Sequence, residues 1–336
     1  MASSHIGLDL ESIIFFSVLT LLGLVIDLFS HRKDSVISFK QALCWTLFWV
    51  IVGVSFGLFL FFHFSPEAAS LYFAGYAFEM ALSVDNLFAI MAIFAWFGLQ
   101  SAYTHRVLYW GILGAMVFRL IFVVIGEALF SLGAYVEILF GLVVGMSAVV
   151  MLKKKEETER SDFSDHAAYK FVRALMPVFP KLVGNNFFIS HKTVNEELIK
   201  SENKDINLKR HGLFYATPLF LCLAIVETSD VMFAFDSVPV VIAVSQDPFI
   251  VYSCMILAML GLRSMYFVLD ALRESIRFLE KGVIVLLFFV AAKLLLAASY
   301  ELFGIGYVVD IYTSLIVIAA VLGGSIILSL VIKEKT

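Results

Sequence analysis

Residues 72–96 read YFAGYAFEMALSVDNLFAIMAIFAW, and the only charged side chains in this run are Glu79 and Asp85. The run is long enough to cross the hydrocarbon core of a bilayer, which takes about 20 apolar residues in a helix. A charged side chain at the centre of such a helix is unfavourable by roughly 2.5–3.5 kcal/mol on insertion scales, so its default interpretation is functional. The stretch therefore predicts a membrane helix with a functional site inside it.

Apolar runs of similar length recur along almost the whole chain. The protein has 336 residues, of which 61% are hydrophobic and 15% charged, and this composition excludes a soluble globular domain of that length. We expect spans at about 10–29, 42–62, 72–96, 107–129, 133–152, 213–236, 250–271, 281–299 and 309–332. The predicted fold class is all-α, a polytopic membrane bundle of about nine transmembrane helices.

The distribution of lysine and arginine predicts how these spans are oriented. Basic residues follow spans one, three, five, seven and nine. The alternate segments contain neither lysine nor arginine, and they are residues 1–9, 63–71, 130–132, 237–249 and 300–308. Basic loops stay in the cytoplasm. The expected location is the plasma membrane, the inner membrane in a bacterium, with the N-terminus outside and the C-terminus cytoplasmic.

Two halves of the chain resemble each other on either side of a long polar segment. Each half has a carboxylate six residues before an aspartate that a small polar residue follows: Glu79 before Asp85, and Asp230 before Asp236. Because each repeat contains three spans, an odd number, the second copy would cross the membrane in the opposite sense. This arrangement is an inverted repeat, which in transporters places the substrate site at the repeat interface near the midplane.

The predicted domain organisation follows from these repeats. Residues 1–71 form two N-terminal helices, 72–152 the first three-helix repeat, 153–212 a cytoplasmic loop, 213–299 the second repeat, and 300–336 the last helix and a cytoplasmic tail. Within the loop, residues 166–176 fit an amphipathic helix lying on the cytoplasmic leaflet, and a plain linker is the alternative.

Acidic residues outnumber basic ones inside the predicted spans. The candidate metal ligands are Glu79, Asp85, Asn86, Glu227, Asp230, Asp236 and Ser237. The candidate charge-balancing or coupling residues are Arg119, Arg263 and Lys293. If acids and bases simply paired, they would be structural salt bridges, but five carboxylates against three bases leave two negative charges. A divalent ion or two protons would balance that excess.

Helical geometry limits how these groups can meet. At 100° per residue, Glu79 and Asn86 share a face, whereas Asp85 lies about 120° away. Two opposed segments with local breaks could focus both acids on one ion, and Pro239 offers a break in the span that carries Asp236.

The donor atoms narrow the choice of ion. Carboxylates, an amide and a hydroxyl are oxygen ligands, which suit Mg²⁺, Ca²⁺ and Mn²⁺. Met80 and Met232 sit beside the acids and would favour a softer ion such as Mn²⁺ if they bound it, although packing is the more common role of methionine. No nucleophile and base occur at a usable spacing, so we expect no enzyme, no catalytic residue and no resident cofactor.

The same acidic motifs carry a resemblance to a known family. They are Phe78-Glu79-x5-Asp85-Asn86, Tyr215-Ala216-Thr217-Pro218-Leu219, Glu227-x2-Asp230-x5-Asp236-Ser237-x-Pro239 and Leu260-Gly261-Leu262-Arg263-x2-Tyr266-Phe267. The chain resembles the TerC family of integral membrane proteins, including its Alx-type manganese exporters, over about residues 10–330. The resemblance implies nine spans, a central acidic metal site and a role in lowering cell manganese, with links of some relatives to tellurium resistance or membrane-protein biogenesis.

Residues and resemblance together predict a secondary transporter that exports a divalent cation, with Mn²⁺ favoured, by proton antiport. Its expected partners are that cation, protons and the lipid bilayer; nothing supports nucleic-acid binding, and the sequence leaves the oligomeric state open. Two alternatives remain: a passive divalent cation channel or importer, and a non-transporting membrane factor for stress resistance or membrane-protein assembly.

Overall fold

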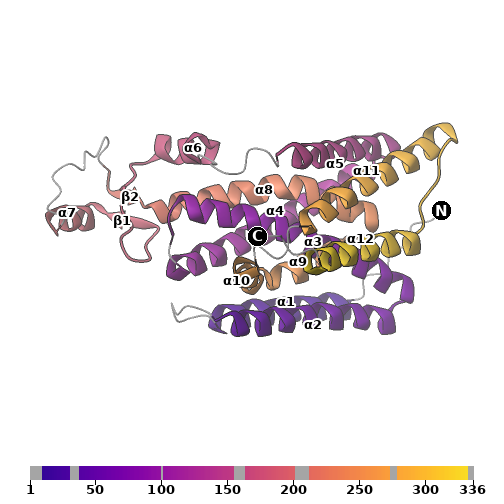
Figure 1. Cartoon of the computed structure of the whole chain (residues 1–336), viewed down its shortest axis with the longest axis horizontal. Helices are drawn as coiled ribbons and strands as arrows, with labels where there is room; N and C mark the ends of the chain where they lie inside the picture. The colour runs from indigo at the N-terminus through magenta and orange to yellow at the C-terminus, as the bar shows by residue number, and fades with distance from the viewer. Residues whose placement is uncertain are drawn as a thin grey trace.

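The computed structural model describes residues 10–30, 38–99, 101–154, 163–200, 212–272 and 278–331. Long helices make up the bundle, and a small module of short elements gathers at one end of it (Figure 1). The long helices are α1 (Leu10–Ser30), α2 (Phe39–His63), α3 (Pro66–Trp96), α4 (Ser101–Phe130), α5 (Ala134–Lys154), α8 (Pro218–Val244), α9 (Pro248–Leu260), α10 (Leu262–Leu272), α11 (Leu279–Phe303) and α12 (Ile311–Val331).

Within the described residues, eight helices are long and apolar enough to cross a membrane, or nine spans if the bent pair α9 and α10 counts as one. The prediction of an all-α polytopic membrane protein is confirmed. The predicted span 250–271 needs correction, because it consists of two helices that meet at 54°. The span predicted at 213–236 also shifts, since its first residues lie in strand β2 (Phe214–Ala216) and the helix begins at Pro218.

The helices begin where the sequence offers capping groups. The Ser38 side chain accepts a hydrogen bond from the backbone N–H of Gln41, and the Gln41 side chain accepts one from the backbone N–H of Ser38. Together they form a capping box at the start of α2. Ser65 caps α3 and Asp247 caps α9, and a proline follows each of them at the first turn. Proline is well tolerated there because its missing N–H would have no partner inside the helix.

Helix α8 passes through Pro239 without a break, contrary to the prediction. Proline removes one backbone donor, and in a membrane helix neighbouring groups can compensate for that loss. The break occurs at Gly261 between α9 and α10, where a Cβ would lie 3.0 Å from Cβ of Trp49 on α2. Since no side chain projects from Gly261, Trp49 can pack directly against the backbone of the bend.

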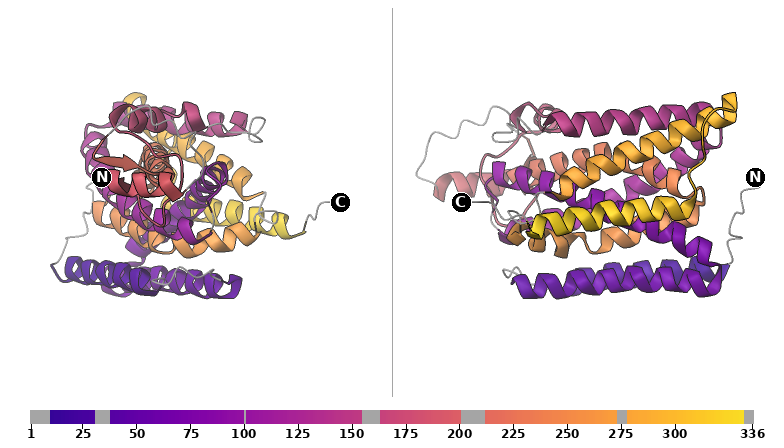
Figure 2. Two further views of the ribbon diagram at one scale, coloured as in Figure 1. Left: turned by 90° about the vertical axis from the view of Figure 1, so that its left-hand side faces the viewer. Right: turned by 45° about the vertical axis from the view of Figure 1, so that its right-hand side comes forward.

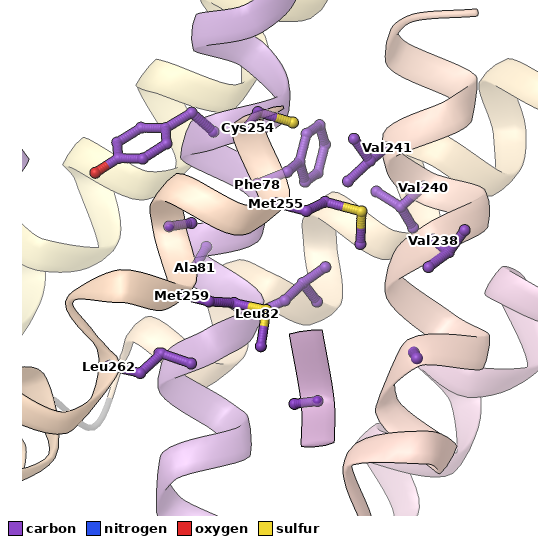
Figure 3. Close-up of a cluster of buried hydrophobic side chains, with 14 of the residues drawn as sticks. Phe78, Ala81, Leu82, Val238, Val240, Val241, Cys254, Met255, Met259 and Leu262 are labelled. Carbon is purple, nitrogen blue, oxygen red and sulfur yellow. The ribbon is translucent and has the colours of Figure 1, made fainter. Parts of the chain in front are cut away.

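Helix α9 occupies the centre of the bundle. Every residue from Phe249 to Leu260 is buried except Tyr252, which is half-buried. Figure 3 shows Met255 and Met259 of α9 in a cluster with Phe78 of α3 and Val241 of α8. By contrast, α1 and α2 lie side by side at the edge of the bundle (Figure 2), where the rings of Phe15 and Phe59 are 4.6 Å apart. Large apolar side chains exposed on these outer helices suit contact with lipid.

The two predicted repeats pack with exchanged partners. Helix α3 packs against α9, and α8 packs against α4. Helices α5 and α11 lie along each other, and α5 touches α8 as α11 touches α3. Exchanging α3, α4 and α5 with α8, α9 and α11 therefore reproduces these contacts. The inverted relation of the repeats stays a prediction.

The polar segment between the halves forms a module, defined here as residues 163–200 and 212–217. It contains the 3₁₀ helix η1 (Phe163–Asp165), α6 (Ala167–Leu175), β1 (Phe188–Ser190), α7 (His191–Lys200) and β2. Strands β1 and β2 pair antiparallel, with Ile189 opposite Tyr215. The predicted helix at 166–176 is confirmed as α6, which buries Val172 against the bundle and leaves Phe171 exposed. Its position relative to a lipid leaflet stays a prediction.

Candidate metal site

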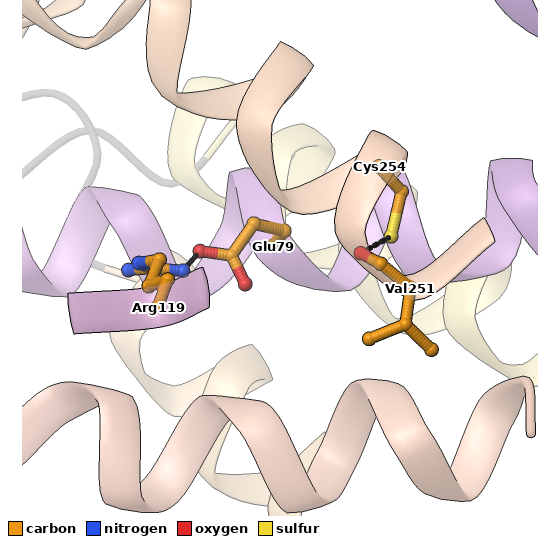
Figure 4. Close-up of polar contacts among 4 residues, drawn as sticks. All are labelled: Glu79, Arg119, Val251 and Cys254. Carbon is orange, nitrogen blue, oxygen red and sulfur yellow. Dashed lines mark hydrogen bonds and ion pairs between the residues drawn. The ribbon is translucent and has the colours of Figure 1, made fainter. Parts of the chain in front are cut away.

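Glu79 of α3 and Arg119 of α4 form an ion pair inside the bundle (Figure 4). Their side chains are 0% and 2% exposed, so both charges are removed from solvent. An ion pair of this kind is unfavourable to desolvate, and removing either partner would leave the other charge buried and uncompensated. The pair therefore holds α3 and α4 in one register at the middle of their spans.

Two carboxylates of α8 join this pair. Asp230 is 9% exposed and interacts electrostatically with Arg119. Glu227, one helical turn earlier, interacts with Asp230 and has its carboxylate against Gly114 of α4. We call Glu79, Arg119, Glu227 and Asp230 the charged cluster. Its three carboxylates and one guanidinium carry an excess of two negative charges when all are ionised.

Several buried oxygens of α3 and α8, within the charged cluster or further along the same helices, have no hydrogen-bond partner among the described residues. They are Oε2 of Glu79, Oε2 of Glu227 and the hydroxyl oxygens of Ser83 and Ser237. Ser83 is 0% exposed and Ser237 is 1% exposed. Buried polar atoms in native proteins nearly always have a partner, so oxygens left over beside excess negative charge favour a cation.

The structure locates only part of the predicted ligand set. Asn86 and Ser237 are buried on α3 and α8, beyond the charged cluster along each helix. The side chains of Asp85 and Asp236 lie outside the described part, although both residues belong to continuous helices. Among the described side chains, no three acids, histidines or cysteines come together as a ready metal site. Coordination of metal by the predicted set therefore stays a prediction.

Arg263 pairs with Asp27 of α1, which was not among the predicted site residues. Its guanidinium lies 3.1 Å from Oδ1 of Asp27 and also donates to the Asp27 carbonyl oxygen, which ties α10 to α1. Arg263 thus ties the first residues of α10, just after the bend at Gly261, to α1. Asp27 stands near the end of the first span, and its position there is the one signal that could have marked it.

Lys293 of α11 contacts residues at the start of α12. Its amino group donates to the hydroxyl of Ser314 on α12, at 3.2 Å, and interacts electrostatically with Asp310. Asp310 precedes α12, and hydrogen bonds from the hydroxyl and amide of Thr313 lower the pKa of its carboxyl. Among the side chains that the structure describes, Arg119 pairs with the predicted acid Glu79 and interacts with the predicted acid Asp230.

The two methionines beside the acids have different surroundings. Met232 is 60% exposed on α8, as expected of a side chain that faces lipid. Met80 is half-buried and lines a cavity of about 10 Å³ with Thr46, Tyr76 and Gly261. Neither position places a thioether among the oxygens of the charged cluster.

These features define the class of protein: a polytopic helical membrane protein with charged residues buried among its described spans. The model of the Integral membrane protein TerC family matches residues 64–336. The chain belongs to the TerC family.

Curated relatives support this assignment. The chain is 52% identical to the "Tellurium resistance protein TerC" of Serratia marcescens over 338 residues, covering 100% of this chain and 98% of that one. The protein of the same name from an Alcaligenes species is also 52% identical, with the same coverage. The "Putative membrane-bound redox modulator Alx" of Photorhabdus laumondii is 34% identical, covering 85% of this chain and 86% of that one. No solved structure matches the chain.

Proposed function

We propose that this protein is a secondary transporter that moves a divalent metal cation through the charged cluster. The observation that carries the proposal is that three carboxylates of the charged cluster face one guanidinium: Glu79 and Asp230 are buried and Glu227 is half-buried. Buried oxygens without a partner among the described residues accompany them. A dication would neutralise the two surplus charges and supply partners for those oxygens.

Oxygen donors suit Mg²⁺, Ca²⁺ and Mn²⁺. The resemblance to Alx-type manganese exporters selects Mn²⁺ among these ions and outward movement as the direction. Arg119 has a defined part in this scheme: it neutralises Glu79 when no metal is present and gives up that carboxylate when metal arrives. We place the protein in the bacterial inner membrane with its N-terminus outside, following the distribution of basic residues.

Export of a dication needs an energy source. Moving two positive charges outward against an inside-negative potential of about 100 mV is unfavourable by about 4.6 kcal/mol. Carboxylates that bind either metal or protons can couple the two, because metal binding requires deprotonated ligands and releases protons. Proton antiport is therefore the proposed coupling.

The exchanged packing of α3, α4 and α5 with α8, α9 and α11 supports alternating access between two inverted repeats. The bend between α9 and α10 offers a hinge next to Trp49, and the Asp27 carboxylate on α1 secures the α10 side of that bend. A passive channel does not need to alternate between two conformations. Flux that a proton gradient cannot drive uphill would therefore favour the channel alternative.

The names of the relatives favour a second candidate. Two of them, each 52% identical, are called tellurium resistance proteins, and a third is named as a redox modulator. A non-transporting membrane factor for stress resistance would use the Glu79–Arg119 pair as scaffolding. In that case, neutralising an acid of the charged cluster would reduce the amount of folded protein. No metal flux would be seen in the wild type or in the variant.

The test is uptake of Mn²⁺, Mg²⁺ and Ca²⁺ into inverted vesicles that contain purified wild-type protein, Asp230→Asn or Glu137→Gln. Glu137 lies at the start of α5, outside the charged cluster, and serves as the matched acid control. We expect Mn²⁺-preferring uptake driven by a proton gradient in wild type and Glu137→Gln, and loss of uptake in a folded Asp230→Asn protein. Absence of flux for all three ions in the wild type would contradict the transporter.

A further inference from the structure

Three glycines of α4 lie against α8, but they meet different groups. A Cβ built at Gly111 would lie 3.2 Å from Cγ1 of Val226, and one at Gly126 would lie 2.8 Å from Cδ1 of Ile242. A Cβ built at Gly114 would overlap both carboxylate oxygens of Glu227 and the carbon between them. The small residues let the two helices approach closely, and at Gly114 the group that uses the space is a charged one.

Glu227 thus lies directly against the backbone of α4. Its Oε2 atom is buried and has no hydrogen-bond partner among the described residues. Arg119, five residues further along α4, carries the guanidinium of the charged cluster. The missing side chain at Gly114 lets the Glu227 carboxylate lie on the same stretch of α4 as this guanidinium.

We propose that Gly114 is a positioning residue that sets where the Glu227 carboxylate sits in the metal site, and so sets the affinity for the metal. This inference rests on the proposed function. It extends the site to a position on α4 that carries no ligand atom, and it predicts that a single added methyl group changes metal binding without unfolding the protein.

The side chain of an alanine at position 114 would meet the Glu227 side chain. The three atoms nearest to the added Cβ all belong to the far end of the flexible Glu227 side chain, which can rotate away. Alanine also has a higher helix propensity than glycine. The fold should therefore persist in Gly114→Ala, and the carboxylate should move off α4.

The experiment measures Mn²⁺ binding to the purified full-length protein for wild type, Gly114→Ala, Gly111→Ala, Glu227→Asp and the double variant Gly114→Ala/Glu227→Asp. Changes to groups that orient metal ligands usually lower affinity roughly 10–100-fold, and we expect a loss in that range for Gly114→Ala. Gly111→Ala, whose methyl group meets only a valine methyl, should bind like wild type.

The double variant distinguishes positioning from packing. Aspartate is one methylene shorter, so its carboxylate withdraws from α4 and leaves room for the alanine methyl. Gly114→Ala/Glu227→Asp should therefore bind Mn²⁺ more tightly than Gly114→Ala. Equal affinity of Gly114→Ala and wild type, or no recovery in the double variant, would overturn the proposal.

A second readout does not depend on metal transport. Dicyclohexylcarbodiimide modifies carboxyl groups in apolar surroundings, and mass spectrometry can follow its reaction at Glu227. Freed from the α4 backbone, Glu227 should react several-fold faster in Gly114→Ala and at the wild-type rate in Gly111→Ala. If wild type neither binds nor moves metal, the proposed function fails, and an unchanged rate in Gly114→Ala would show that the positioning also fails.

Discussion

Partner choice inside the bundle is decided at the scale of single residues. Glu79, Glu227, Asp230 and Arg119 stand out in the sequence because charged residues are rare in membrane spans. In the structure, each of the four interacts with at least one of the others. The partners of Arg263 and Lys293 could not be predicted from the sequence. Each partner depends on how the helix is rotated about its axis and on which helix packs beside it. Arg263 meets Asp27 of α1 and Lys293 meets Ser314 of α12, contacts that no spacing within one helix encodes.

The Glu79–Arg119 pair gives a prediction at this scale. Breaking a buried ion pair by removing one partner is unfavourable by about 3–5 kcal/mol because the remaining charge is uncompensated. Arg119→Met and Glu79→Gln should each lower the temperature of heat denaturation in detergent, and the double variant should be more stable than either single variant. Strictly additive losses in the double variant would show that the two side chains do not depend on each other.

Helix packing decides the structure at the scale of elements. Local sequence favours a break at Pro239 over one at Gly261, because proline is the stronger helix breaker in isolation. The structure reverses that order, since Trp49 of α2 packs against the backbone at Gly261 while α8 continues through Pro239. Contacts between helices far apart in the chain were needed to predict the bend.

Glycines of α2 give a prediction for such a contact. Gly53 and Gly57 lie one turn apart, and a Cβ at Gly53 would be 2.6 Å from the hydroxyl oxygen of Tyr76. Tyr76 is buried and stacks on Tyr72, whose hydroxyl donates to the Gly53 carbonyl oxygen at 2.9 Å. Gly53→Ala should therefore overpack the contact between α2 and α3 and destabilise the protein by about 1–3 kcal/mol.

Helix α12 provides the control for Gly53→Ala. A Cβ at Gly323 or Gly324 would meet no atom within 4 Å among the described residues. Alanine at either position should leave the denaturation temperature unchanged or raise it, because helix propensity improves by about 1 kcal/mol. Equal losses for Gly53→Ala and Gly323→Ala would mean that the ring contact has no special role.

At the scale of the whole molecule, composition was sufficient to predict a polytopic membrane protein, and the eight or nine spans agree with it. The repeated acidic motifs lie on α3 and α8, which pack against each other; α3 also packs against α9, and α8 against α4. Sidedness, the inverted relation of the halves and the ion remain predictions. These three properties depend on the membrane, on an alternative conformation of the transporter and on the transported ion. The contacts within a single conformation do not determine them.

In the proposed function, the charged cluster binds a divalent cation in exchange for protons. Calorimetric titration of the purified protein with Mn²⁺, in two buffers of different ionisation enthalpy, measures affinity and released protons together. We predict binding with proton release in wild type, weaker binding at lower pH because the carboxylates become protonated, and loss of binding in folded Asp230→Asn. Absence of binding in wild type, or equal binding in Asp230→Asn, would contradict metal binding by the charged cluster.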